Sequence, residues 1–329
     1  MTKKKNILIA GGAGYIGSHA CKALSEAGYV PITVDNLSTG HEYAVKWGPL
    51  ETLDIRNGEG LDNVFNKYPI EAVMHFAACI EVSEGEAKPD KFYDNNVMGT
   101  LSLVNAMRRA NVEKIVFSST CATYGETKNM PLSESALQLP KSVYGHTKHT
   151  AEKILESYHN AYGLKYAALR YFNACGADKD GEIGEDHDPE THLIPNALKA
   201  AAGLGDGLHV FGNDYDTPDG TCIRDYIHVT DLAVAHISAL EALDEHDTLK
   251  CNLGTGKGVS VLEVINAIEK VTGRAVPYEF HPRRKGDLTQ LYSDTSLAKK
   301  LLGLNPKFSD IETIVKTAWD FHVKMWDIN

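Results

Sequence analysis

The chain contains two tyrosine–lysine pairs with the same four-residue spacing, Tyr124…Lys128 and Tyr144…Lys148. On a helix this spacing places both side chains on one face. An ammonium group held beside a phenol favours the ionised form, which can exchange a proton with a substrate hydroxyl. Both pairs are therefore candidates for acid–base chemistry, and the spacing alone does not choose between them.

The surrounding residues favour the second pair. Tyr144 and Lys148 begin a helical pattern, "YGHTKHTAEKILESYHNAYG", whereas Tyr124 lies in "TYGETKNMP", whose glycine and proline predict a loop. Thr120 ends the strand-like segment "KIVFSST", and its hydroxyl can hydrogen-bond the substrate hydroxyl that Tyr144 deprotonates. We predict that Thr120, Tyr144 and Lys148 are catalytic and that they support hydride transfer at a carbinol carbon.

A second set of candidate functional residues lies in and after the glycine-rich segment "ILIAGGAGYIGSH". Gly11, Gly14 and Gly17 lie between a predicted strand and a predicted helix, where they permit a tight turn and let the backbone approach a pyrophosphate. Asp35 ends the next predicted strand, where a carboxylate accepts hydrogen bonds from the adenosine ribose of NAD and repels the extra phosphate of NADP. The segment predicts NAD as the cofactor. The positive nicotinamide ring of NAD⁺ and the ammonium of Lys148 are together expected to lower the pKa of the Tyr144 phenol from about 10 by ~3 units.

The elements that must position these groups alternate between strand and helix. "NILIA", "YVPITV", "EAVMHFAA" and "EKIVFSS" are short buried strands, and amphipathic segments separate several of them. This order predicts an α/β fold with a doubly wound, Rossmann-type parallel sheet. The pattern loosens near Ala174, so we expect a dinucleotide-binding domain over 1–173, joined by about 227–256. Residues 174–226 and 257–329 are expected to form a smaller α/β lobe that binds the substrate.

Charge and cysteine usage exclude several classes of protein. The formal net charge is −11, which argues against nucleic acid or an anionic membrane surface as the main partner. The six cysteines are scattered without a C-x-x-C pair, which is typical of reduced thiols in the cytoplasm. His187, Asp188 and His192 lie in an acidic segment without ordered spacing, so we expect a solvated loop and no metal site. No segment approaches the ~20 apolar residues of a membrane span.

Longer signatures make the assignment specific. "GGAGYIGSH", "VDNLSTG", "HFAA", "NNVMGTL", "FSSTCATYGE", "YGHTKH", "LRYFNACGA", "FGNDYDTPDGTCIRDYIHV" and "RRKGDL" follow one another across nearly the whole chain. The chain thereby resembles the UDP-glucose (UDP-galactose) 4-epimerases of the extended short-chain dehydrogenase/reductase superfamily. The resemblance implies reversible interconversion of UDP-galactose and UDP-glucose through a transient 4-keto sugar with bound NAD. We expect a cytoplasmic homodimer.

The resemblance also assigns the two binding sites residue by residue. The NAD site is expected to be lined, besides the three glycines, by Tyr15, Ile16, Asp35, Asn36, Asp54, Ile55, Phe76, Ala77, Ala78, Asn95, Tyr144, Lys148 and Phe172. The UDP-sugar is expected to contact Thr120, Tyr144, Asn173, Leu193, Arg224, Arg284, Asp287 and Leu291. The arginines have an independent reason, because an acidic protein needs local guanidinium groups to hold a diphosphate. Without the family, Arg224 could also form a surface ion pair with Asp225 or Asp219.

Three positions depart from the family pattern. Ile80 stands where some members have lysine, His192 where asparagine is common, and Leu291 where tyrosine, cysteine or a smaller residue lies near the sugar. The first two bear on nucleotide affinity and the third on sugar specificity.

Several alternatives stay open. One is a 4-epimerase acting on a UDP-N-acetylhexosamine, UDP-pentose or UDP-uronate, and another is a non-catalytic dinucleotide sensor. A dehydratase or decarboxylase is disfavoured because Cys121 and Ala122 follow Thr120 where those enzymes need a carboxylate.

Overall fold

Seven parallel strands form the main sheet of the computed structural model, which describes residues 4–127, 129–284 and 286–328. Their order is β3-β2-β1-β4-β5-β6-β10, so the winding direction reverses between β1 and β4. The strands are β1 (Asn6–Ala10), β2 (Val30–Asp35), β3 (Leu50–Thr52), β4 (Ile70–His75), β5 (Lys114–Thr120), β6 (Lys165–Tyr171) and β10 (Thr248–Leu253). This confirms the expected doubly wound fold, in which ligands bind at the carboxyl ends of the strands near the reversal.

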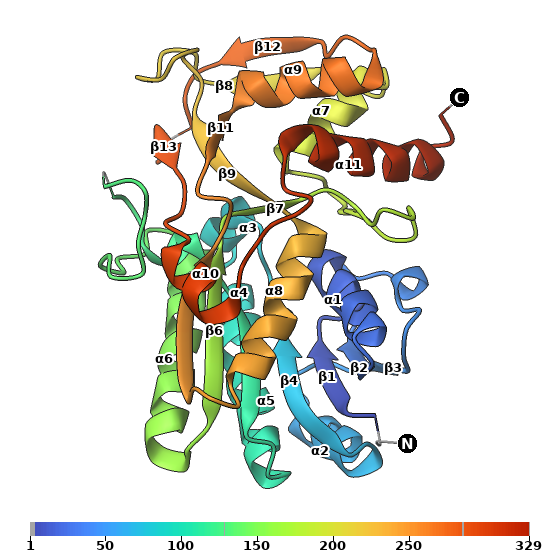
Figure 1. Cartoon of the computed structure of the whole chain (residues 1–329), viewed down its shortest axis with the longest axis vertical. Coiled ribbons are helices and arrows are strands. Elements are labelled where there is room, and N and C mark those ends of the chain that lie inside the picture. The colour runs from blue at the N-terminus through green and yellow to red at the C-terminus, as the bar shows by residue number, and fades with distance from the viewer. Residues whose placement is uncertain (1–3, 128, 285, 329) are drawn as a thin grey trace.

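Helices cover both faces of this sheet because its strands are apolar on both faces (Figure 1). Ile7 and Ile9 face one core and Leu8 and Ala10 the other, as alternation along a strand requires. The first core includes residues of α1 (Tyr15–Glu26), α8 (Val229–Ala242) and α10 (Ser296–Leu302), and the second those of α2 (Gly58–Lys67), α5 (Gly99–Arg109) and α6 (Val143–Tyr162). Shorter elements connect them: η1 (Glu42–Ala44), α3 (Val82–Ala87), α4 (Pro89–Phe92), the π-helix η2 (Tyr93–Met98) and η3 (Cys121–Thr123).

A smaller lobe lies beyond the carboxyl ends of the main sheet (Figure 1). In its four-stranded sheet, β7 (Asn173–Cys175) and β13 (Gln290–Leu291) pair parallel to β9 (Ile223–His228), and β11 (Gly258–Ser260) pairs antiparallel to it. Two further strands, β8 (Leu208–Phe211) and β12 (Tyr278–His281), form a separate pair. Three helices pack in the core of this lobe: α7 (Leu193–Ala201), α9 (Val261–Thr272) and α11 (Ile311–Met325).

Helix α10 differs from the expected division. The sequence analysis placed residues 257–329 in the smaller lobe, but Ala298 and Leu302 of α10 are buried in the core of the main sheet. The helix packs there against α8 and β10, because its apolar side chains complete the face that those two elements leave open.

Among the helices that the structure describes, none is both long and apolar enough to cross a lipid bilayer.

Candidate active site

The glycine turn connects β1 to α1 at the point where the strand order reverses. Gly11 has a φ of +84°, and a Cβ there would lie 2.5 Å from the backbone nitrogen of Ala77. A Cβ on Gly17 would lie 2.0 Å from the carbonyl oxygen of Gly11. The chain's own packing therefore requires these two glycines, in agreement with the tight turn and the close packing of helix and strand that glycines between these elements permit.

Gly14 is the glycine that leaves room for a ligand. A Cβ there would meet one atom of the described residues within 4 Å, the Gly11 carbonyl oxygen at 3.5 Å. Gly14 is also the N-cap of α1, where no side chain caps the helix and no acidic residue occupies the first turn. An uncapped helix N-terminus with an open approach fits an anionic pyrophosphate, so the residues present fit the expected dinucleotide.

Asp35 closes the turn from the neighbouring strand. Its carboxylate accepts hydrogen bonds from the backbone N–H of Ala13 at 3.0 Å and of Leu37 at 2.9 Å. Asn36 donates to Asp54 at 3.0 Å, so three of the predicted cofactor residues meet at the carboxyl ends of β2 and β3. Hydrogen bonds from the Arg56 guanidinium hold the pKa of Asp54 below its usual range.

The remaining cofactor candidates lie around this turn in different environments. The backbone N–H groups of Phe76 and Ala77 donate to the carbonyl of Ala10, which fixes the segment after β4 against the glycine turn. Ile55 is buried in the core. Tyr15 donates its hydroxyl to the carbonyl of Gly176 at 2.6 Å. Half-buried positions are occupied by Ile16, Ala78, Asn95 and Phe172.

Tyr144 and Lys148 lie on the first turns of α6, which begins at the Ser142 N-cap. The ammonium of Lys148 donates to the carbonyl of Ser118 at 2.8 Å, and the side chain of Thr120 lies close enough to the Tyr144 hydroxyl to lower its pKa. Both partners belong to the end of β5. Since β5, β4 and β1 are adjacent in the sheet, the structure brings the three predicted catalytic residues to the edge that carries the glycine turn.

Burial shifts both pKa values toward the neutral forms. Desolvation raises the pKa of Tyr144, and the neighbouring Tyr171 adds to the effect, while the hydrogen bond with Thr120 opposes it. Desolvation lowers the pKa of Lys148 to about 7. In the chain alone, burial therefore outweighs the lowering of the phenol pKa, which was expected from Lys148 and the nicotinamide ring together.

Tyr124 has a different environment from Tyr144. Its hydroxyl donates to Asn252 at 2.7 Å and accepts from the guanidinium of Arg170 at 2.9 Å, and its side chain is fully buried. Its partner in the sequence pattern, Lys128, lies outside the described residues. The Tyr124 hydroxyl thus serves a buried polar network.

That network was missed by the sequence analysis. Arg170 on β6 and Glu152 on α6 form a bidentate ion pair with nitrogen–oxygen distances of 2.9 and 2.6 Å, and both side chains are 2% exposed. Ser119, next to Thr120, donates to Glu152 at 2.5 Å. One helical turn separates Glu152 from Lys148, so Glu152 fixes α6 against β6 through Arg170 and against β5 through Ser119, next to the predicted catalytic residue Thr120.

Asn96 was also missed. It is buried in η2, where its side chain accepts from the N–H of Cys79 and donates to the carbonyl of Cys79 and to Thr147. It thereby connects the segment after β4 to the residue before Lys148. The only signal in the sequence was its place beside Asn95 in "NNVMGTL", which does not distinguish the two asparagines.

The predicted substrate residues other than Thr120 and Tyr144 lie in the smaller lobe. Arg224 on β9 donates to the carbonyls of Ile223 and Leu288, each at 2.8 Å, and pairs with Asp287 at 3.3 Å. Leu291 lies opposite Arg224 in the register of β13 with β9. The partner of Arg224 is thus Asp287 and not either of the aspartates considered from the sequence.

Two more substrate candidates flank β9 and α7. Asn173 on β7 donates to the carbonyl of Asp225 at 2.8 Å, which ties it to the strand of Arg224. Leu193 is half-buried at the start of α7 and packs against the core of the lobe.

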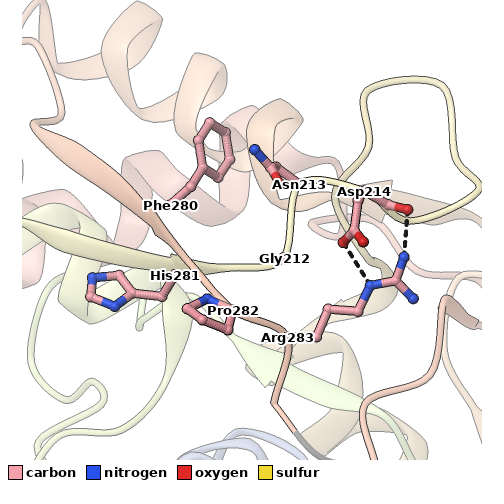
Figure 2. A pocket seen from close by; sticks show the side chains of 7 residues that line it. All are labelled: Gly212, Asn213, Asp214, Phe280, His281, Pro282 and Arg283. Carbon is pink, nitrogen blue, oxygen red and sulfur yellow. Dashed lines mark hydrogen bonds and ion pairs between the residues drawn. The ribbon is translucent and has the colours of Figure 1, made fainter.

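The basic run at 283–285 divides into residues with different roles. Arg283 pairs with Asp214 at 2.7 Å and lies over the ring of Tyr215, next to a pocket of about 410 Å³ at the ends of β8 and β12 (Figure 2). Arg284 lies over the ring of Phe211, with its carbonyl accepting from the N–H of Asp287 at 3.2 Å. Lys285 lies outside the described residues. Arg284 is therefore the arginine of this run that is connected to Arg224.

The acidic loop before α7 is not the solvated segment that the sequence analysis expected. His187 and His192 converge there with Glu185 and Glu190, and the side chains of both glutamates are nearly fully buried. Asp188 is exposed and outside the group.

The sheet order, the open glycine turn and the grouping of Thr120, Tyr144 and Lys148 at one edge of the sheet are typical of a Rossmann-type, dinucleotide-dependent protein with a second, smaller lobe. The chain belongs to the NAD dependent epimerase/dehydratase family, whose model matches residues 7–254.

Individual relatives match over nearly the full length. The UDP-glucose 4-epimerase of Rhizobium meliloti (strain 1021) is 50% identical over 97% of this chain and 98% of its own. The crystal structure of UDP-glucose 4-epimerase from Brucella ovis in complex with NAD has a TM-score of 0.94 and 52% identity, covering 96% of this chain and 98% of that chain. The enzyme from Bifidobacterium longum in complex with NAD⁺ and UDP has a TM-score of 0.92 and 38% identity, covering 97% of this chain and 98% of that one.

Proposed function

We propose that the protein is an NAD-dependent UDP-glucose 4-epimerase that interconverts UDP-galactose and UDP-glucose by inversion at C4. The observation that carries the proposal is the position of Tyr144 and Lys148 on one face of α6, beside Thr120 and the open turn at Gly14. The similarity to UDP-glucose 4-epimerases over nearly the whole chain supports the same reaction.

In this reaction Tyr144 removes the proton from the sugar O4 and later returns it, while Thr120 hydrogen-bonds the same oxygen. Bound NAD supplies the redox chemistry, as a hydride acceptor and donor for C4. Lys148, held by the Ser118 carbonyl, positions the nucleotide and supplies positive charge when protonated. The 4-keto sugar formed in this way is an intermediate, which turns and presents its other face, so that the returning hydride and the proton from Tyr144 give the C4 epimer.

The smaller lobe keeps that ketone from escaping by holding the UDP. Arg224 and Arg284 are proposed to hold the diphosphate, with Asp287 orienting Arg224. The other substrate contacts are proposed at Asn173, Leu193 and Leu291. We propose the NAD contacts as they were expected from the sequence: Gly11, Gly14, Tyr15, Ile16, Gly17, Asp35, Asn36, Asp54, Ile55, Phe76, Ala77, Ala78, Asn95, Tyr144, Lys148 and Phe172.

The direct test is incubation of the purified protein with UDP-galactose, without added reductant, followed by separation of the nucleotide sugars. We expect UDP-glucose to accumulate until the two sugars reach equilibrium. Conversion of UDP-N-acetylgalactosamine, a UDP-pentose or a UDP-uronate in parallel reactions, with no conversion of UDP-galactose, would replace the proposed substrate. No conversion of any of them, with NAD bound, would favour a dinucleotide sensor.

We further propose that the protein works as a homodimer in the cytoplasm. Tyr93 and Met98 expose large apolar side chains on η2, as a subunit interface requires, and the cysteines are free thiols, as in a reducing compartment. Light scattering of the purified protein should give the mass of two chains, and the mass of one chain would contradict the dimer.

A further inference from the structure

Two histidines and two glutamates converge in the loop between β7 and α7. The Nδ1 atom of His192 lies 2.9 Å from Glu185 Oε1 and 3.0 Å from Glu190 Oε1. The Nδ1 atom of His187 lies 3.5 Å from Glu185 Oε1 and 3.6 Å from Glu190 Oε2. One potential ligand atom from each of the four residues lies within 4.8 Å of the others.

Two carboxylates buried side by side need positive charge. The side chains of Glu185 and Glu190 are only 5% and 3% exposed, and an isolated buried carboxylate is strongly destabilising. The charge can come from two protonated imidazoles or from one dication bound by two neutral imidazoles. Both arrangements are electrically balanced, so the geometry has to distinguish them.

His187 favours the dication. Its Nδ1 atom is buried and has no hydrogen-bond partner among the described residues, although two carboxylate oxygens face it. A protonated imidazole in this place would form two long ion pairs, at 3.5 and 3.6 Å, but its buried Nδ1–H would make no hydrogen bond of normal geometry, which costs free energy. A neutral imidazole has a lone pair on Nδ1 that can bind a metal ion.

The distances fit a small tetrahedral ion. Metal–ligand bonds of about 2.0–2.1 Å to nitrogen and oxygen give ligand-to-ligand distances of about 3.3–3.4 Å along the edges of a tetrahedron. Glu185 Oε1 lies 2.9 and 3.5 Å from the two imidazole nitrogens, and Glu190 Oε2 lies 3.6 Å from that of His187, so these distances lie on both sides of this value. Glu190 is already held in place, because its Oε1 accepts the backbone N–H groups of Thr191 and His192.

We propose that Glu185, His187, Glu190 and His192 bind one divalent transition-metal ion, with Zn²⁺ the best match to two imidazoles and two carboxylates. The site is structural and lies outside the reaction. The ring of His187 packs edge-on against Tyr15 of α1 at 6.1 Å, and His192 is the N-cap of α7, directly before Leu193. The ion thus connects the helix of the nucleotide turn to the start of the helix that carries a proposed substrate contact.

Metal analysis of protein made without a histidine tag tests the proposal. We expect one zinc ion per chain, lost after dialysis against a strong chelator and regained on adding Zn²⁺. Co²⁺ added to the metal-free chain should give the intense visible bands of a tetrahedral site. Bound metal should raise the unfolding temperature, because it binds the folded chain in preference to the unfolded one.

His187→Gln and Glu190→Gln should lower zinc affinity by more than the ~10–100-fold that loss of an outer-shell partner causes. His281→Gln is the matched control, because His281 (Figure 2) belongs with His209 and Glu279 to a separate, more exposed group on β8 and β12. It should keep the zinc and the cobalt spectrum. Substoichiometric zinc in the parent after equilibration with Zn²⁺, or equal loss in His281→Gln, would overturn the proposal. These readouts do not depend on epimerase activity.

Discussion

Removal of a single hydroxyl from Tyr144 or from Tyr124 should have opposite consequences. Tyr144→Phe deletes the group that exchanges a proton with the sugar O4, and acid–base catalysis typically contributes 10²–10⁴-fold to a rate. We expect kcat to fall by ~100-fold or more, which corresponds to about 2.7 kcal/mol of activation free energy. The free energy of unfolding should change little, since the Tyr144 hydroxyl interacts with Thr120 at the site and not with the buried network of Tyr124.

Tyr124→Phe should instead destabilise the fold. The Tyr124 hydroxyl lies between Asn252 Oδ1 and an Arg170 nitrogen, at 2.7 and 2.9 Å, and the whole cluster is buried. Without it, one donor and one acceptor lose a partner, and an unsatisfied buried polar group costs ~1–3 kcal/mol. Arg170 keeps its two bonds to Glu152, so the loss should stay partial and kcat should remain near that of the parent.

Initial rates of UDP-glucose formation and urea unfolding, measured on the parent and both variants, separate the two effects. Retained NAD in Tyr144→Phe serves as the control for an intact site. Equal loss of kcat in the two variants would refute the assignment of Tyr144, and so would a Tyr144→Phe enzyme with unchanged kcat.

Three further predictions concern the cofactor, the lysine and the sugar. Asp35→Ala should weaken the preference for NAD over NADP. It should also loosen the glycine turn, because Asp35 accepts a hydrogen bond from the N–H of Ala13. Equal affinities of the parent for the two cofactors, measured by titration, would contradict the role of Asp35 in cofactor choice. The pKa of Lys148 is about 7 in the folded chain and 10.5 in the unfolded chain. Between pH 7 and pH 10.5 the unfolded state therefore binds more protons at this group, and the contribution of Lys148 to the free energy of unfolding rises with pH. Urea unfolding of the nucleotide-free chain across this window should therefore show a smaller rise in Lys148→Met, and an unchanged slope would exclude the shifted lysine. Leu291 lies opposite Arg224. Packing strain of ~1–3 kcal/mol against an acetamido group should favour UDP-glucose over its N-acetylated counterpart by about 5- to 150-fold in kcat/KM, and Leu291→Ser should reduce this ratio. Equal kcat/KM values for the two sugars in the parent would contradict a role of Leu291 in specificity.

Local patterns in the sequence were sufficient for the main fold and for the candidate catalytic helix. Alternating strands and helices predict a parallel sheet because both faces of each strand must be covered, and the seven-stranded sheet confirms this. The choice of Tyr144 as the candidate base rested on helical periodicity, which is a property of neighbouring residues, and the structure places Tyr144 on α6 with Lys148. Gly14 and Asp35 were recognisable because a turn between a strand and a helix is also local.

Contacts between distant segments could not be read in this way. Arg224 pairs with Asp287, 63 residues away, and a charge pattern does not specify which carboxylate a guanidinium meets after folding. The same holds for Glu152 and Arg170, whose ion pair depends on α6 packing across β6, and for α10, whose apolar face fits the core of the main sheet.

The pKa values and the histidine–glutamate group depend on tertiary structure most directly. In an unfolded chain Lys148 would have the ordinary lysine pKa of 10.5, and the pKa falls because the fold removes the ammonium group from water. The segment from Glu185 to His192 is polar and acidic, which indicates a solvated loop when composition is the only guide. Only in the folded chain do two glutamates point inward with two imidazoles against them. Helices α1, α7 and α11 pack around the loop and bury the carboxylates, and burial makes two carboxylates costly unless positive charge lies beside them.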